Sequence, residues 1–396
     1  MIKYYRLFLP LLLPSLSLSA RAQDKQNMFN PVNASVTSQT FAPDARAAGM
    51  GDVGVATDPD VNSQYWNPAK YPFNISGAGV ALNFTPWLRS LVNDMNLAYL
   101  SGYYRIGDYS AVSASLRYFN MGEVFLSNPE ENDNAMTINP YEFAIDAGYS
   151  RMLSERFSMA VNMRFIFSDI RYDYTAESSA GKAFAADIAM YRLGYFMMGS
   201  RECSFAWGLN INNIGSKISY GGDDNAEFIP TNLRLGLNMT VPFNEYNKFS
   251  VAVDANKLLV PTYPKQDTEN GETDNDYTDR VQKDYYDVSP IAGIFKSFYD
   301  APNGFKEEMQ EIQWSVGCEY TYNDRFMLRG GYHHEAANKG NRKYFTVGAG
   351  FHMSVFTVDA SYVFSTSQTN PLDQTMRFSL GFDLDGMRDL FGKRRR

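Results

Sequence analysis

The most constraining feature of the sequence is a strict alternation of apolar and polar residues, which residues 312–334 show most clearly. Apolar side chains occupy every second position as far as Tyr320, with polar residues between them. A period of two is typical of a β-strand with one apolar and one polar face. Asn323 and Asp324 form a turn, after which the alternation resumes, so this stretch predicts a hairpin. The pattern fits either a very large soluble β-sandwich or a membrane barrel with its apolar face outward.

The N-terminus favours the membrane barrel. Lys3 and Arg6 precede an apolar run, and the stretch ends in Ala-Arg-Ala, so residues 1–22 are predicted to be a signal peptide. No later stretch reaches the roughly 18 apolar residues that a transmembrane helix needs. Aromatic residues make up 15% of the chain, which is typical of strands and of the interfacial girdles of outer-membrane barrels. We therefore expect an outer-membrane protein.

The connections between the alternating segments predict fourteen antiparallel strands between residues 77 and 385. Bacterial barrels have short turns in the periplasm and longer loops outside. Residues 288–298 also resemble a strand, but a fifteenth strand would place the short turn at Asn323 outside the cell. Residues 259–311 are therefore expected to form one extracellular loop, with a short helix at residues 303–312. We also expect a β-bulge near Arg192.

The two ends of the chain lack the alternation. Residues 23–76 contain five prolines and are expected to form a hatch at the periplasmic mouth of the barrel. Residues 49–54, Gly-Met-Gly-Asp-Val-Gly, match G-x-G-x-x-G, but a dinucleotide site needs a strand before this motif and a helix after it. We favour a close approach of the backbone to the barrel wall. Residues 386–396 are expected to be a basic periplasmic tail.

The polar face of the strands carries charges of both signs, which are expected to point into the lumen. They are interpreted either as mutually satisfied ion pairs or as a path for a solute. These inward residues are Arg117, Glu142, Asp146, Arg164, Arg234, Asp254, Glu319, Arg329, Asp359 and Arg377.

Catalytic and metal chemistry find little support in the sequence. The chain has three histidines, and the adjacent His333 and His334 point to opposite faces of a strand, so they cannot chelate one ion together. No G-x-S-x-G elbow, P-loop or H-E-x-x-H motif is present. A net charge of -8 provides no basic stripe for nucleic acid. We therefore expect no catalytic residues, metal, cofactor or nucleic-acid partner.

Several blocks of the sequence resemble a known family. Residues 41–54, Phe-Ala-Pro-Asp-Ala-Arg-Ala-Ala-Gly-Met-Gly-Asp-Val-Gly, and residues 63–70, Ser-Gln-Tyr-Trp-Asn-Pro-Ala-Lys, are similar to the N-terminal signature of the PorV (LptO) family of the type IX secretion system. Residues 297–302 and 340–345 resemble its later blocks. The resemblance implies a barrel like that of the FadL fatty-acid transporters, with fourteen strands and an N-terminal hatch. The Asn-Pro-Ala hatch motif of that fold matches Asn67, Pro68 and Ala69.

The resemblance also implies a function. Members of this family take secreted cargo with a C-terminal signal domain from the translocon to the sortase at the cell surface, and are not enzymes. The expected partners are therefore the translocon, the cargo and the sortase, with membrane lipid around the barrel. The alternative is a FadL-like passive transporter of hydrophobic small molecules, which needs a continuous apolar pocket beneath the hatch.

The extracellular loops are the expected docking surface, because only they can meet a protein that has crossed the membrane. The loops near Glu130 and Asp223 and at residues 266–287 are acidic. Residues 259–311 are too long for a simple hairpin connection. They also contain apolar residues that either grip a partner or pack over the barrel mouth, namely Ile291, Ile294, Phe295, Phe298 and Phe305.

Overall fold

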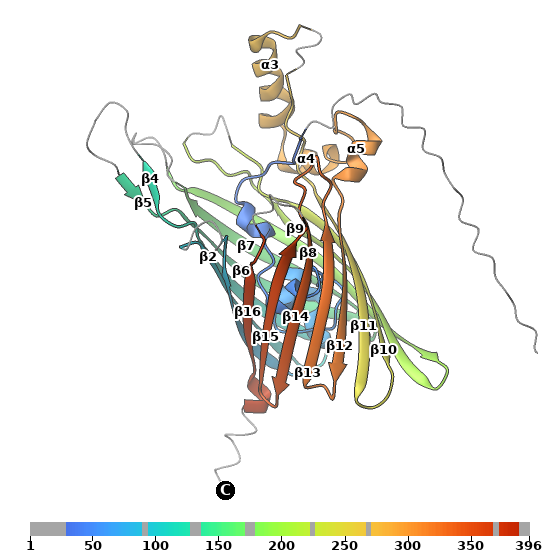
Figure 1. Cartoon of the computed structure of the whole chain (residues 1–396). Helices are drawn as coiled ribbons and strands as arrows, with labels where there is room; N and C mark the ends of the chain where they lie inside the picture. Colours follow the sequence, from blue (N-terminus) through green and yellow to red (C-terminus); the bar gives the residue numbers. More distant parts are fainter. Residues whose placement is uncertain are drawn as a thin grey trace, which may run out of the picture.

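Fourteen antiparallel strands close into a barrel in the computed structural model, which describes residues 29–88, 94–126, 136–170, 179–221, 226–266, 271–366 and 372–387 (Figure 1). The fold class and strand number expected from the sequence are thus confirmed. The strands are β1 (Ala78–Pro86), β2 (Asn96–Ile106), β3 (Ser110–Asn120), β6 (Tyr141–Ser154), β7 (Phe157–Asp169), β8 (Gly181–Met198), β9 (Arg201–Gly215), β10 (Asn232–Pro242), β11 (Asn247–Leu258), β12 (Gln313–Tyr322), β13 (Phe326–His334), β14 (Lys343–Met353), β15 (Phe356–Ser365) and β16 (Met376–Asp383).

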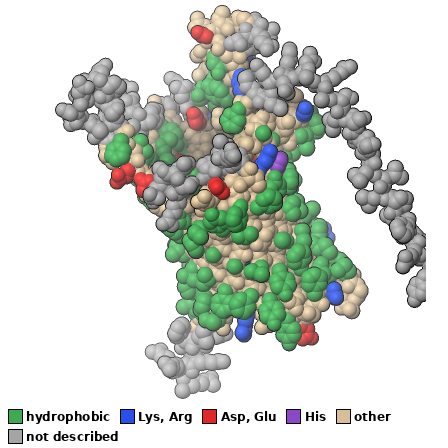
Figure 2. Space-filling model, viewed as in Figure 1, with side chains coloured by type: hydrophobic (Ala, Val, Ile, Leu, Met, Phe, Trp, Pro, Cys, Tyr) green, Lys and Arg blue, Asp and Glu red, His purple; other side chains and the backbone are tan. Residues whose placement is uncertain are grey.

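The polarity of the barrel is the reverse of that of a soluble protein. In β3 the apolar Val112, Leu116 and Tyr118 are exposed, whereas Ser115 and Arg117 on the other face are buried. Figure 2 shows hydrophobic side chains gathered over the outer wall of the strands. Apolar residues at alternate positions can face lipid, while the other half of each strand faces the interior.

The barrel closes where β1 pairs with β16, from Gly79 opposite Asp383 to Phe84 opposite Phe378. We call the end with the short turns the turn end, and the opposite end the loop end. At the loop end, β4 (Val124–Leu126) and β5 (Met136–Ile138) form a separate two-stranded sheet. In the described residues, no helix is both long and apolar enough to span a membrane.

One local prediction about the wall was wrong. We expected a bulge near Arg192, but β8 and β9 pair regularly there, and the register shifts between Ala186 and Ile188. Asp187 lies opposite both Asn212 and Asn213, and Asn213 adopts a positive φ of 58°. The Asp187 carboxylate accepts a hydrogen bond from the Asn213 backbone N–H at 2.8 Å, which stabilises this bulge.

The connection between β11 and β12 is helical. It contains α3 (Asp274–Val281), the π-helix η4 (Gln282–Tyr286), α4 (Pro290–Lys296) and α5 (Phe305–Gln310). Residues 288–298, which resembled a strand, form α4 instead, because Ser289 accepts a hydrogen bond from Ala292 N–H as N-cap and Pro290 occupies the first turn. The helix expected at residues 303–312 is confirmed as α5.

The N-terminal segment runs through the whole lumen. It contains η1 (Thr37–Thr40), α1 (Ala45–Ala48), α2 (Ser63–Trp66) and η2 (Pro68–Phe73). We expected residues 23–76 at the periplasmic mouth, but Asn30 N–H donates to the Asn338 carbonyl at the loop end, 2.7 Å away. Only near Asn74, whose carbonyl accepts from Arg105 at 2.7 Å, does the segment reach the turn end. We call residues 29–76 the plug.

Several sequence predictions lie outside the described residues. These are the signal peptide at residues 1–22, the acidic positions Glu130 and Asp223, residues 267–270 of the acidic stretch, and the basic tail beyond residue 387.

The path of the plug can be tested by labelling cysteines in intact cells. Phe29 is 62% exposed at the loop end, and Ile75 is fully exposed at the turn end. With short turns in the periplasm, a membrane-impermeant maleimide should label Phe29→Cys in intact cells, but Ile75→Cys only after the outer membrane is permeabilised. Labelling in the reverse order would contradict this path. The parent protein is the control, since Cys203 is buried and Cys318 is only partly accessible.

Candidate functional site

The plug backbone lies directly on glycines of the barrel wall. A Cβ on Gly317 or Gly331, which pair across β12 and β13, would overlap the Met50 backbone. Gly51 has a positive φ of 76°, and a Cβ there would lie 2.7 Å from the Tyr332 nitrogen. These contacts confirm that the G-x-G-x-x-G stretch reflects close packing of backbone against wall.

Asp254 of β11 holds the next part of this stretch. Its carboxylate accepts hydrogen bonds from the Gly54 and Val55 backbone N–H groups, at 2.8 and 3.0 Å. The side chain is fully buried. A buried carboxylate is tolerated when backbone donors satisfy it, so Asp254 fixes the position of the plug in the lumen.

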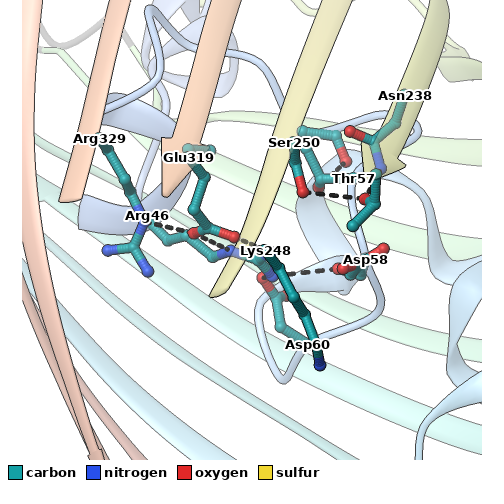
Figure 3. A network of polar contacts seen from close by, with 12 residues as sticks. Arg46, Thr57, Asp58, Asp60, Asn238, Lys248, Ser250, Glu319 and Arg329 are labelled. Carbon is teal, nitrogen blue, oxygen red and sulfur yellow. Dashed lines mark hydrogen bonds and ion pairs between the residues drawn. The ribbon is translucent and has the colours of Figure 1, made fainter. Parts of the chain in front are cut away.

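Arg46 of the plug enters a chain of ion pairs on the wall (Figure 3). Its guanidinium lies 2.9 Å from Asp60, also in the plug, and 3.1 Å from Glu319 of β12. Glu319 also pairs with Arg329 at 2.6 Å, and Arg329 pairs with Asp359 at 2.6 Å. This network links the plug to β12, β13 and β15.

Tyr65 of the plug lies between two wall arginines. Arg117 and Arg234 stack on its ring, with 4.9 and 4.3 Å from guanidinium carbon to ring centroid. Arg234 also donates to the Tyr65 hydroxyl at 2.8 Å, and Arg117 donates to the carbonyls of Ser38 and Phe41. Both arginines therefore interact with the plug through aromatic faces and main-chain carbonyls.

The remaining inward charges also find partners. Arg164 pairs with Asp146 at 2.6 Å and with Asp187 at 3.0 Å, all on the wall. Glu142 accepts a hydrogen bond from the plug residue Ser38, and Arg377 pairs with Asp52 of the plug at 2.9 Å. All ten inward residues are therefore buried and have at least one partner inside the barrel, although Asp254 Oδ1 and Arg377 Nε have none in the described residues. This arrangement favours the structural interpretation over a solute path.

The Asn-Pro-Ala motif anchors the part of the plug that leads to the turn end. The Asn67 amide donates to the carbonyls of Val55 and Met190, at 3.1 and 2.9 Å, and its oxygen accepts from Ala69 N–H at 3.1 Å. Pro68 starts η2, and Ala69 is fully buried against the wall. Asn67 thus links two turns of the plug to β8.

A cavity of about 330 Å³ lies between the plug and the wall at the loop end. His333 points inward, with its Nδ1 2.8 Å from the Ser315 hydroxyl, whereas His334 faces outward and stacks on Trp314. The described residues contain no group of three potential metal ligands. Charged residues are prominent in the cavity lining, which includes Asp52, Arg234, Glu311, His333, Glu335, Lys339 and Arg342.

We call residues 259–311 the cap, and a buried charged cluster holds its last helix, α5, over the barrel. Lys339, from the loop after β13, pairs with Glu307 at 2.6 Å and Glu311 at 3.0 Å. Lys257, at the end of β11, pairs with Glu308 at 3.0 Å and with Glu311. No direct signal in the sequence predicts these pairs, because their partners are far apart in the chain. Only the spacing of the three glutamates on one short helix hints at a shared face.

The plug is part of this cluster. Asn30 donates to Glu307 at 3.0 Å, and the Lys265 amine donates to the Phe29 carbonyl at 2.9 Å. The beginning of the plug therefore lies against the cap, so the two cannot move independently without breaking these bonds.

The outer face of the cap exposes apolar side chains. Gly293 and Ser297 of the α4 segment are buried, whereas Ile291, Phe295 and Phe298 on its other side are 65%, 65% and 48% exposed. Phe305 on α5 is 79% exposed, and Ile294 is half-buried. The expected loop residues thus lie mostly at the surface, together with Tyr299 and Met309, which the sequence interpretation missed.

Two acidic groups of the cap have shifted pKa values. Burial alone would raise the pKa of Glu307, but hydrogen bonds from Lys339 and Asn30 outweigh burial and lower it to about 2. Burial, together with the nearby Glu308 and Glu311 carboxylates, raises the pKa of Asp300 to about 6. Asp300 accepts a hydrogen bond from Thr262 N–H at 2.8 Å.

A substitution at the wall glycines tests the close approach of the plug. Gly331→Ala should displace Met50 and lower the thermal unfolding temperature of the purified barrel, because its Cβ overlaps plug backbone that cannot rotate away. Gly330→Ala is the matched control, since its Cβ meets nothing closer than 3.8 Å. Equal unfolding temperatures for the two variants would contradict the packing.

The stability of the cap should depend on pH in two opposite ways. Glu307 has a folded pKa below its ordinary 4.5, so its contribution is present above pH 4.5 and is lost as pH falls towards about 2. Asp300 has a folded pKa above its ordinary 3.8, so its contribution is present below pH 3.8 and is lost as pH rises through about 6.

Hydrogen exchange of residues 290–311, corrected for intrinsic rates, measures this dependence. Protection should be greatest between about pH 3.8 and 4.5, where the Glu307 contribution is nearly complete and the Asp300 contribution is still largely present. Asp300→Asn should abolish the loss above that range, and Glu307→Gln the loss below it. If Asp300→Asn still loses protection at high pH, or Glu307→Gln still loses protection at low pH, the assigned group is wrong.

Comparison with known proteins agrees with this architecture. The family model described as "Type IX secretion system protein PorV" matches residues 22–265. No curated protein matches the chain. Among solved structures, the TodX deltaS2S3 mutant monoaromatic hydrocarbon channel gives a TM-score of 0.50 at 11% identity, covering 86% of this chain and 98% of that chain.

Two further structures are similar at lower TM-scores. The Pseudomonas putida toluene transporter TodX gives 0.46 at 9% identity, covering 90% of this chain and 98% of that chain. A Pseudomonas aeruginosa FadL homologue gives 0.41 at 12% identity, covering 86% and 98%. At such identities the likeness concerns the fold alone. The family match extends over more than half of the sequence and includes the entire plug. The chain therefore belongs to the PorV family of type IX secretion system proteins, and is a FadL-like barrel of the outer membrane.

Proposed function

We propose that the protein is a non-enzymatic carrier that receives cargo with a C-terminal signal domain from the type IX translocon and delivers it to the surface sortase. The outer face of the cap is the docking surface in this proposal. The observation that carries it is the exposed apolar side of α4 and α5, at the end of the barrel where the long loops lie outside the cell.

The arrangement of α4 suits recognition. Ile291 and Phe295 lie four residues apart on α4, so they project from one side of the helix, and Phe298 follows three residues later in the turn beyond its end. Large exposed aromatic residues are uncommon on a monomeric surface and often mark an interaction site. The buried charged cluster holds α5 in place before a partner arrives, and Lys296 of α4 donates to the Asp284 carbonyl at 2.8 Å. Such preorganisation reduces the entropy lost on binding.

The acidic stretch has a different part in this proposal. Asp274, Asp276 and Asp279 on α3 are exposed, and Arg280 pairs with Glu272 instead of with these aspartates. A surface of one sign steers an oppositely charged partner and accelerates association more than it strengthens binding. We therefore assign attachment to the apolar face and steering to α3.

The passive transporter has less support from the lumen. Backbone of the plug lies on the wall glycines, and the cavity at the loop end has many charged residues in its lining. A transporter of hydrophobic molecules needs a continuous apolar pocket, so the interior of this barrel suits that function poorly.

Capture from native outer membranes tests the carrier function. The tagged protein should retain cargo with an uncleaved C-terminal signal domain, and mass spectrometry quantifies that cargo. The double variant Phe295→Ser, Phe298→Ser should lower the captured amount about tenfold or more, because buried aromatic residues dominate interface energies. Deleting residues 267–280, which spares the packing of Tyr285 on Phe228, should slow capture but leave the final amount almost unchanged.

The matched control is Phe125→Ser. Phe125 is an exposed phenylalanine on β4, also at the loop end but outside the cap. Heat-modifiable migration on gels verifies that every variant keeps the barrel. If both phenylalanine variants capture cargo as well as the parent, the cap is not the docking surface; if the parent itself captures no such cargo, the carrier function is wrong.

A further inference from the structure

The β8–β9 hairpin extends beyond its neighbour at the turn end. The last pair between β7 and β8 joins Phe157 to Arg192, but β8 continues to Met198. On the other side, β9 remains paired with β10 as far as Ser204 opposite Thr240. Residues 193–198 thus have β9 on one side and, within the described part of the chain, no strand on the other (Figure 1).

The open side carries unused main-chain groups. Leu193 N–H donates to the Arg156 carbonyl at 3.0 Å, and among the described residues this is the last bond of the edge to the neighbouring hairpin. Residues of an antiparallel strand direct their N–H and C=O groups alternately to either neighbour. Tyr195 and Met197 therefore direct theirs to the open side, as Leu193 does, whereas Phe196 and Met198 direct theirs to β9.

The edge is apolar on both faces. Residues 193–198 read Leu-Gly-Tyr-Phe-Met-Met, without a charge or a proline. Tyr195, Phe196, Met197 and Met198 are 53%, 40%, 62% and 44% exposed. Natural proteins usually protect open edges with charges, prolines or bulges, and this edge has none of them between residues 193 and 198.

Neither solvent suits this edge. In water its apolar side chains stay exposed on both faces, and in lipid each unpaired N–H or C=O group is destabilising. A strand added to the edge satisfies the main chain and covers the side chains at the same time. The dual requirement favours a protein partner over lipid alone.

The base of the edge is a groove of about 720 Å³, bordered by Ser154, Glu155, Arg156, Phe157, Arg192 and Trp207. Phe157, Arg192 and Trp207 form one row across β7, β8 and β9, with 6.1 Å between the two aromatic rings. Arg156 and Arg192 are exposed, and neither guanidinium has a hydrogen bond or ion pair in the described residues. With two arginines and one glutamate, the groove favours an acidic group.

We propose that the open edge of β8 is a periplasmic docking site, distinct from the cap, for an extended apolar segment of another envelope protein. The segment adds as a strand beside Tyr195 and Met197, and an acidic residue at its end enters the groove between Arg156 and Arg192. This site does not depend on the carrier function, because it lies at the opposite end of the barrel.

Binding of a synthetic strand to the full-length protein in lipid nanodiscs tests the site. The probe is a fluorescent peptide with the sequence Thr-Val-Thr-Val-Thr-Val-Thr-Asp, and a second peptide ends in an amidated Asn. Met197→Pro removes a donor on the open side and leaves the bonds to β9 intact, whereas Met197→Ala removes the side chain and keeps the donor.

Fluorescence anisotropy should show binding of the acidic peptide to the parent. Met197→Pro should weaken it about tenfold or more, and Met197→Ala less than about threefold, because a hydrogen bond and the fit of the strand are lost only in the first. The double variant Arg156→Gln, Arg192→Gln should remove the preference for the acidic peptide over the amidated one.

Each of the following results would overturn the proposal. One is equal affinity of the Pro and Ala variants, or no binding by the parent up to millimolar peptide. The other is a groove that retains phosphatidylglycerol in an Arg192-dependent manner, by native mass spectrometry, while no peptide binds; the arginines would then belong to a lipid headgroup site. Heat-modifiable migration confirms that each variant is folded.

Discussion

The structure depends on one requirement, that polar groups inside an inverted barrel must find partners there. The outer wall is apolar, so charges such as Asp254, Arg117 and Arg234 point inward, where each would be costly if left unpaired. The plug provides what the wall lacks: backbone N–H groups for Asp254, carbonyls for Arg117, and the ring of Tyr65 for both arginines. The plug therefore forms the core of this protein, and the barrel is its shell.

The same requirement connects the two ends of the molecule. The plug begins against the cap, through Asn30 and Glu307, crosses the lumen through Arg46 and Glu319, and ends at Arg105 near the short turns. A partner that moved the cap would either break its hydrogen bonds to the first plug residues or move those residues together with the cap. The plug contacts the wall along its length. A partner that affects one end of the barrel can therefore influence the other end through these bonded contacts of the plug.

The sequence predicted the wall much better than the contents of the lumen. Alternation is a local signal, so it placed Arg164 and Glu319 inside and Val112 outside, and the order of short and long connections fixed fourteen strands. The plug has no period, and its direction depends on contacts such as Asn30 with Asn338, more than 300 residues apart in the chain. The bulge at Asp187 and the partners of Lys257 and Lys339 are likewise long-range. Residues 288–298 resembled a strand because apolar residues occupy alternate positions from Val288 to Ile294. The N-cap at Ser289 and the proline in the first turn are the local signals for a helix.

Among the places in the described chain that depart from the rule that apolar residues face either lipid or the interior, two form continuous surfaces. One is the outer side of α4 and α5, and the other is the end of β8, where both faces are apolar. Local inconsistencies of this kind are expected at functional sites, because selection for stability alone would replace the exposed residues. They lie at opposite ends of a barrel whose interior is occupied by the plug and its ion pairs. A protein with a filled lumen and unsatisfied surfaces at its ends is suited to hold partners, and the chemistry of its interior serves mainly to keep those surfaces in place.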